Sequence, residues 1–175
     1  SGLTMGGLVI GVSIPLVGMS QSSANEFSPS AFIHIAPSGD TTLYCGRCEM
    51  GQGISTALPA AVADELEADW SRVKVLQGEG NKEKYGPQGT GGSKSINVMF
   101  EPMRKAGAAG KELLLAAAAE TWNVDVSDCR AESHIIYNRN DDRKLGYGEL
   151  AETAARIASE KGVPEDPVLK TRDQF

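Results

Sequence analysis

The sequence predicts an α+β fold, and three patterns carry that prediction. Residues 31–36 and 41–46 are short β-rich runs joined by Pro37-Ser38-Gly39-Asp40, a turn typical of a β-hairpin. Residues 96–117 place apolar side chains at helical spacing over several turns. Further strand-like and helix-like runs follow. We therefore predict a β-hairpin followed by strands and helices, with one long kinked helix.

The amino-acid composition indicates which classes of protein are compatible with this sequence. The 175 residues are 41% hydrophobic and 23% charged, which is ordinary for one globular domain with its own core. The net charge is -6 and the sequence pI is near 5.0. Because nucleic-acid binding requires clustered lysine and arginine to neutralise phosphates, nucleic acid is not expected as a partner.

A first helix is predicted from Ser55, as its capping residue, to about Ala68. Pro59 is placed in the first turn, where its missing N–H costs nothing. Residues 72–77 then alternate like a strand. The apolar face of the helix repeats every fourth residue through Leu58, Val62 and Leu66.

The long helix should follow the glycine-rich loop 78–92 and end near Asn123. Pro102 is expected to kink it. Gly107 and Gly110 leave one face slim enough for close backbone packing.

The last third of the chain predicts two more strand regions, 129–137 and 144–145, on either side of the turn-rich residues 138–142. A final helix over 147–159 should be stopped by Gly162.

The N-terminal segment has the pattern of an export signal. Residues 3–17 are apolar and glycine-rich, too short to span a bilayer comfortably, and are followed by the small polar stretch 20–25. The alternative is a buried core segment, which Pro15 and the glycine pairs would weaken. The basic region that would precede an export signal is not in this sequence.

Two segments share one design, a glycine loop that follows a strand and opens a helix. Free N–H groups at a helix N-terminus attract anions, and glycines let the backbone approach a ligand. Neither matches a dinucleotide fingerprint or a Walker loop, and plain turns with good helix caps stay open as the alternative. The candidate site residues are Met50, Gly51, Gln52 and Gly53, and Thr90, Gly91, Gly92, Ser93, Lys94 and Ser95.

Gln52 is the most specific of these residues. Its amide can donate and accept at once, which suits the edge of a heterocycle better than a phosphate. If one extended ligand touches both loops, residues 46–54 and 89–96 must lie at the same edge of the domain.

Five runs of sequence resemble a known family. They are residues 31–39, 49–59, 64–70, 89–95 and 147–151. Together they are similar to the N-terminal part of the molybdopterin-binding large subunit of the xanthine dehydrogenase family, of the isoquinoline oxidoreductase or membrane-bound aldehyde dehydrogenase type. The resemblance covers nearly the whole chain in order.

The resemblance implies a larger subunit, exported to the periplasm by the twin-arginine route, that carries molybdopterin cytosine dinucleotide. It places Gly51, Gln52 and Gly53 against the pterin. The pyrophosphate and cytidine would lie against the second loop, at Gly91, Gly92, Ser93 and Ser95. The chain then divides into an export segment with linker (1–25), a partial molybdopterin-binding domain (26–163) and a linker to further domains (164–175).

The implied activity is that of a molybdenum hydroxylase acting on an aldehyde or an N-heterocycle, with water as the oxygen source. Electrons would leave through iron-sulfur clusters in a separate small subunit, with a membrane cytochrome c as a further partner. The family's catalytic glutamate lies far downstream and matches no residue here, so the chain alone should be inactive. The alternative is a small exported α+β module, complete in itself, that binds an anion or cycles a thiol pair.

Cys45 and Cys48 form a C-x-x-C pair. With only His34, His134 and Cys129 as further candidates, we expect no metal site, and instead a disulfide or two packed thiols. Both histidines are expected to be structural.

Overall fold

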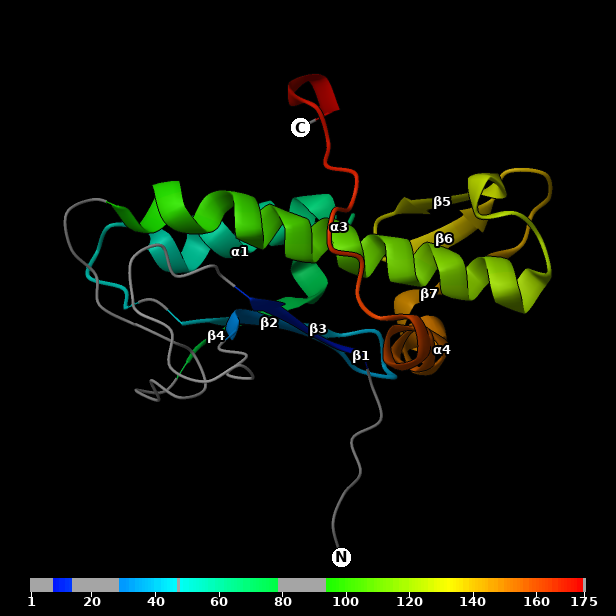
Figure 1. Ribbon diagram of the computed structural model, residues 1–175, viewed down its shortest axis with the longest axis horizontal. Coiled ribbons are helices and arrows are strands. Elements are labelled where there is room, and N and C mark those ends of the chain that lie inside the picture. Colours follow the sequence, from blue (N-terminus) through cyan, green and yellow to red (C-terminus); the bar gives the residue numbers. More distant parts are fainter. Residues whose placement is uncertain (1–7, 14–28, 47, 79–93, 175) are drawn as a thin grey trace, which may run out of the picture.

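The computed structural model describes residues 8–13, 29–46, 48–78 and 94–174. In these residues two β-sheets pack with three α-helices, so the predicted α+β class is confirmed. Figure 1 shows α1 and α3 side by side over one face of the larger sheet, with the smaller sheet towards the far end of α3. None of the described helices is long and apolar enough to cross a membrane.

The larger sheet has the strand order β1-β2-β3-β4. Its first three strands are antiparallel, whereas β4 runs parallel to β3. A parallel neighbour requires a crossover, and helix α1 supplies it between β3 and β4. The strands are β1 (Leu8–Ser13), β2 (Pro29–Ile35), β3 (Thr41–Cys45) and β4 (Val73–Gln77).

The predicted hairpin and the strand after the first helix are both present. Strands β2 and β3 pair from Ala31 with Cys45 to Ile35 with Thr41. Their turn is closed by the Gly39 N–H, which donates to the Ala36 carbonyl at 2.8 Å. Alternate residues of β3 are buried beneath the helices, as the period of a half-buried strand requires.

Residues 8–13, inside the segment interpreted as an export signal, form strand β1 at the edge of this sheet. They pair with β2, with Leu8 opposite Ile35 and Ile10 opposite Ile33. The structure thus places these residues in the folded sheet, and their role as an export signal stays a prediction. The reason for the pairing is tertiary: β2 has a free edge whose backbone N–H and C=O groups need partners.

Helix α1 spans Ile54–Glu65, and its start corrects two predictions. The capping residue is Gly53, in the left-handed region at φ 79°, while Ser55 lies within the helix. Pro59 therefore falls in the second turn, where its missing N–H leaves the Ser55 carbonyl without that helical bond. The helix also ends earlier than predicted, because Glu67 turns to positive φ (55°).

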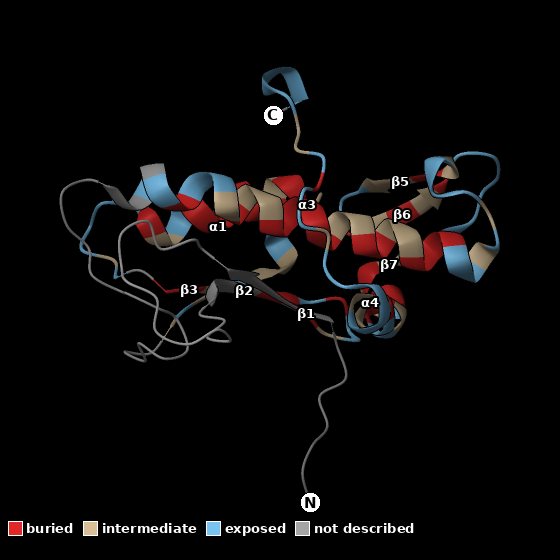
Figure 2. Cartoon of the chain, viewed as in Figure 1, coloured by how far each residue is buried: buried red, intermediate tan, exposed pale blue. Residues whose placement is uncertain are grey.

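Helix α3 spans Lys94–Trp122 and continues without a break through Pro102. Its end is as predicted, since Asn123 takes a positive φ of 54° and stops the helix. The predicted close backbone packing on the glycine face of α3 is confirmed at Gly107, where an added Cβ would lie 2.4 Å from the Val62 carbonyl oxygen. The backbones of α1 and α3 thus approach closely, and Figure 2 shows buried residues along the helices where they face the core. The predicted bend at Pro102 stays a prediction.

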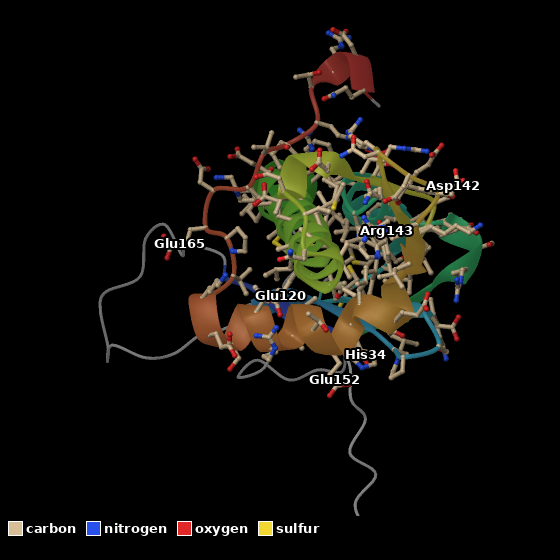
Figure 3. All side chains as sticks on the ribbon, turned by 90° about the vertical axis from the view of Figure 1, so that its right-hand side faces the viewer. His34, Glu120, Asp142, Arg143, Glu152 and Glu165 are labelled. Carbon is tan, nitrogen blue, oxygen red and sulfur yellow. The ribbon has the colours of Figure 1, made fainter. Side chains whose placement is uncertain are left out.

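The smaller sheet has the antiparallel order β5-β6-β7, with β5 (Cys129–Glu132), β6 (Ile135–Asn138) and β7 (Lys144–Gly146). Helix α4 (Tyr147–Lys161) follows and ends at Gly162, at φ 83°, as predicted. Figure 3 views this end of the molecule, where Asp142 and Arg143 lie in the exposed turn between β6 and β7.

The C-terminal segment, predicted as a linker, lies against the helices. The Val168 N–H donates to Glu112 of α3 at 2.8 Å. The fully buried carboxylate of Glu65 accepts hydrogen bonds from the Lys170 N–H at 3.1 Å and from Arg104 at 2.8 Å. Hydrogen bonds from Arg104 and from the Lys170 N–H offset part of the cost of burying this carboxylate. This ion pair fastens the segment to α1 and α3.

Candidate functional site

The first glycine loop lies between β3 and α1, at the end of the molecule where both α1 and α3 begin (Figure 1). Its residues are open to solvent: Met50 is 69% exposed, and Gly51, Gln52 and Gly53 are exposed as well. Short turns at the start of a helix leave several backbone N–H groups outside the helical hydrogen-bond pattern. The partners of those N–H groups decide what the loop can bind.

The carboxylate of Glu49 accepts hydrogen bonds from three of them. Its Oε1 accepts hydrogen bonds from the N–H groups of Gly51 (2.7 Å) and Gly53 (3.0 Å). Its Oε2 accepts from Ser55, through the backbone N–H at 3.0 Å and the hydroxyl at 2.7 Å. The prediction that the N–H groups at this helix start are free for an external anion is therefore wrong for these three.

The same four hydrogen bonds lower the pKa of Glu49 to about 2, with the Ser55 hydroxyl as the largest cause. Glu49 is consequently a carboxylate anion at any physiological pH. Glu49 was not among the site residues predicted from the sequence. The signal that could have revealed it is an acidic residue a few positions before a glycine-rich helix start, where the helix dipole and free N–H groups favour negative charge.

Gln52 is held by the loop itself. Its Oε1 accepts from the Met50 N–H at 2.6 Å, and its Nε2 donates to the Cys48 carbonyl at 3.0 Å. An amide has two lone pairs on oxygen and two N–H groups. One acceptor position and one donor position are thus left beyond these two bonds, on a side chain whose orientation is already set.

Gly51 and Gly53 adopt φ values of 91° and 79°. Among the described residues, apart from the chain neighbours, a Cβ built on either would meet no atom within 4 Å. These positions therefore require glycine for backbone conformation and not for packing within this chain. The open space beside them is where a ligand can approach the backbone.

The second glycine loop falls largely outside the described residues. Thr90, Gly91, Gly92 and Ser93 are not among them, and the structure gives only backbone positions for Lys94 and Ser95, the first two residues of α3. The described helix starts, Ile54 and Lys94, lie at the same end of the molecule (Figure 1). That arrangement agrees with one edge for both loops, which stays a prediction for the loop itself.

The structure also places the two cysteines of the C-x-x-C pair and His134. Cys45 is buried at the end of β3, and Cys48 is exposed; both are thiols. His134 is fully buried, with hydrogen bonds on both ring nitrogens, so its predicted structural role is confirmed. Among the described residues, no three His, Cys, Asp or Glu side chains gather closely enough to hold a metal ion.

A family model for the molybdopterin cofactor-binding domain matches residues 2–175. The chain belongs to this family. The resemblance predicted from the sequence is thus confirmed.

Two relatives of this family have named activities. The beta subunit of isoquinoline 1-oxidoreductase from Brevundimonas diminuta is 34% identical over 137 residues, which cover 75% of this chain and 18% of that subunit. The membrane-bound aldehyde dehydrogenase (pyrroloquinoline-quinone) of Gluconacetobacter polyoxogenes is 37% identical over 124 residues, covering 71% of this chain and 16% of that protein. The chain therefore spans less than a fifth of the length of either relative.

Solved structures share the fold. CO dehydrogenase from Oligotropha carboxidovorans aligns over 93% of this chain and 20% of its own, with a TM-score of 0.61 and 22% identity. Quinoline 2-oxidoreductase from Pseudomonas putida 86 aligns over 79% of this chain and 17% of its own, with a TM-score of 0.57 and 21% identity. At this identity the likeness shows a shared fold alone.

The loop 48–53 fits a pterin better than a phosphate. A pterin ring carries neighbouring donors and acceptors on its edge, which is what the remaining positions of the Gln52 amide can pair. A phosphate would lie against the Glu49 carboxylate, which already accepts hydrogen bonds from the N–H groups of Gly51, Gly53 and Ser55.

Proposed function

We propose that this chain is the cofactor-binding portion of a molybdenum hydroxylase that oxidises an aldehyde or an N-heterocycle with water as the oxygen source. The observation that carries the proposal is the Gln52 loop, in a chain that belongs to the molybdopterin cofactor-binding domain family. When bound, the molybdenum cofactor supplies the two-electron oxidation of the substrate. The relatives named for isoquinoline and aldehyde oxidation support the two substrate classes.

The chain's own part is to orient the ring end of the cofactor. Gln52, fixed by Met50 and Cys48, offers one donor and one acceptor to the pterin edge. Gly51 and Gly53 allow the ring to approach the backbone without obstruction. Because the side chain is already oriented, little conformational entropy is lost when it pairs with the ring.

The dinucleotide form and the electron path are further parts of the proposal. We place the pyrophosphate and cytidine of molybdopterin cytosine dinucleotide at Gly91, Gly92, Ser93 and Ser95, with Thr90 and Lys94 as additional donors. Electrons leave through iron-sulfur clusters in a separate small subunit and then to a membrane cytochrome c. A relative that is itself named as a beta subunit supports a multi-subunit enzyme.

We also propose a periplasmic location, reached by twin-arginine export. The apolar residues 3–17 support it, whereas the pairing of β1 with β2 argues that residues 8–13 remain in the mature protein. Sequencing the N-terminus of the mature subunit decides between these two roles. A mature chain that begins beyond Asn25 would show that the segment is a signal.

The test of the function measures molybdenum and cytosine dinucleotide per purified full-length subunit. Gln52→Ala should reduce both partly, because an unpaired polar group costs about 1 to 3 kcal/mol while other contacts remain. Gly53→Val should reduce them more, because a branched residue disfavours positive φ and its Cβ enters the open space beside the loop. Full cofactor content in both variants would show that the loop is only a helix cap.

The isolated chain should show no turnover of aldehydes or heteroaromatics, since it lacks a match to the catalytic glutamate of the family. Turnover by residues 1–175 alone would contradict the assignment of the chemistry.

A further inference from the structure

The start of α1 differs from an ordinary anion site because its donors converge on a carboxylate of the same chain. Four donors, from Gly51, Gly53 and Ser55, reach the two oxygens of Glu49 at 2.7 to 3.0 Å. Each oxygen takes two of them. An external phosphate would need the same N–H groups and would meet a negative charge already in place, which in this partly exposed loop repels it.

Glu49 also fixes the backbone on both sides of Gln52. The N–H of Gly51 and the N–H of Gly53 both donate to the same oxygen, Oε1. Between them the Gln52 side chain folds back to the Met50 N–H and the Cys48 carbonyl. The position of the amide thus depends on the backbone that the Glu49 carboxylate holds in place.

We infer that Glu49 is a positioning and anion-excluding residue of this loop: it occupies the anion position at the start of α1, so that the loop presents Gln52 to an uncharged ring edge and rejects the phosphate groups of the same cofactor. This inference rests on the proposed function. The inference adds an orientation of the cofactor to that function. The phosphate groups of the cofactor must be held away from the start of α1, and the pterin ring must face Gln52. The depressed pKa of Glu49 agrees with a charge that persists through the working pH range.

The experiment compares Glu49→Ala and Glu49→Gln in the full-length subunit. The control is Asp125→Ala, which removes a carboxylate that likewise accepts a local backbone N–H, that of Ser127 at 2.8 Å, at the other end of α3. Two quantities are measured: molybdenum per protein, and the rise in melting temperature of cofactor-free protein when inorganic phosphate replaces chloride at equal ionic strength.

For Glu49→Ala we expect molybdenum retention to fall about fivefold, the factor that corresponds to one lost hydrogen bond. We also expect a phosphate-dependent rise in melting temperature beyond that of the wild type, because the released N–H groups now accept an anion. Asp125→Ala should match the wild type in both measurements. Glu49→Gln keeps one acceptor oxygen and loses the charge, so it should be intermediate in molybdenum content and should gain part of the phosphate response.

A Glu49→Ala protein that melts lower, keeps its molybdenum and responds to phosphate like the wild type would overturn the inference and leave Glu49 as a helix cap. If the alanine variant does not fold, the isosteric Glu49→Gln provides the same two measurements. A wild-type full-length subunit without molybdenum cofactor would instead refute the proposed function. In that case the phosphate response of the variants still decides whether Glu49 excludes anions.

Discussion

The loop at the start of α1 and the buried cluster around His134 are built in opposite ways. The hydrogen bonds that Glu49 and Gln52 make in their loop join residues at most six positions apart, and the loop is largely exposed. In the cluster, His134 bonds Thr41, 93 positions away, and the Asp69 N–H, 65 positions away. The local network depends on a few neighbouring residues, whereas the buried one joins distant parts of the chain.

The His134 cluster ties both sheets to the helices. Because the Asp69 N–H donates to Nδ1 at 2.6 Å, the neutral ring carries its hydrogen on Nε2 and donates it to the Thr41 hydroxyl at 2.8 Å. The His134 ring lies 4.8 Å from the ring of Tyr147, whose hydroxyl donates to the Leu66 carbonyl at 2.6 Å. Burial raises the pKa of Tyr147, so it stays a neutral donor.

The largest effect is expected from His134→Ala. It leaves the Thr41 hydroxyl and the Asp69 N–H without their partner and opens a cavity, which together should lower the free energy of unfolding by about 3 to 4 kcal/mol. His34→Ala, at a partly exposed strand position, is the matched control and should cost less than about 1 kcal/mol. The free energies of unfolding are measured by urea denaturation. Equal losses in the two variants would show that the cluster contributes no more to stability than the rest of the sheet.

A smaller loss, about 2 kcal/mol, is expected from Gly107→Ala at the contact between α1 and α3. The new Cβ would lie 2.4 Å from the Val62 carbonyl oxygen, so the helices must move apart. Gly146→Ala, where the nearest atom is the flexible Glu149 carboxylate at 3.4 Å, is the control and should change the melting temperature little. No loss in Gly107→Ala would mean that the helix pair is not rigidly packed.

The pH dependence of stability separates the two regions. Burial, followed by the nearby Arg72, lowers the pKa of His134 below its ordinary 6.5. The unfolded chain therefore takes up a proton that the folded chain resists, and stability present above about pH 6.5 is lost as the pH falls. Glu49, with a pKa near 2 against an ordinary 4.5, loses its contribution only below about pH 4.5.

Unfolding midpoints between pH 7.5 and 5.5 test this order. The slope in that window should flatten in His134→Gln and persist in His34→Gln. An unchanged slope in His134→Gln would assign the pH dependence to another group.

The smallest effect is expected in the loop. Ser55→Ala removes the hydroxyl that donates to Glu49 at 2.7 Å but keeps the backbone N–H bond, so stability should fall by less than about 1 kcal/mol. The pKa of Glu49 should rise, since this hydroxyl is the largest cause of its depression. Carboxylate titration by NMR provides the measurement, and an unshifted Glu49 would show that the hydroxyl does not bond it in solution.

The sequence by itself determined most elements, because their signals are local. The Pro-Ser-Gly-Asp turn predicted the hairpin, the helical spacing predicted the long helix, and Gly162 predicted the end of α4. The glycine loops were found for the same reason, and so was the family, whose motifs are runs of adjacent residues. Glu49 was overlooked because its role depends on how the chain bends back over six residues and not on any one residue type.

Only the tertiary structure decided which residues meet from distant parts of the chain. The strand at residues 8–13 forms because β2 offers an unpaired edge, which no local pattern in that segment reveals. Likewise, nothing beside His134 in the sequence indicates Thr41 or Asp69, and nothing beside Glu65 indicates Arg104 or Lys170. Buried polar groups require partners wherever the fold brings them, and that requirement is satisfied only in three dimensions.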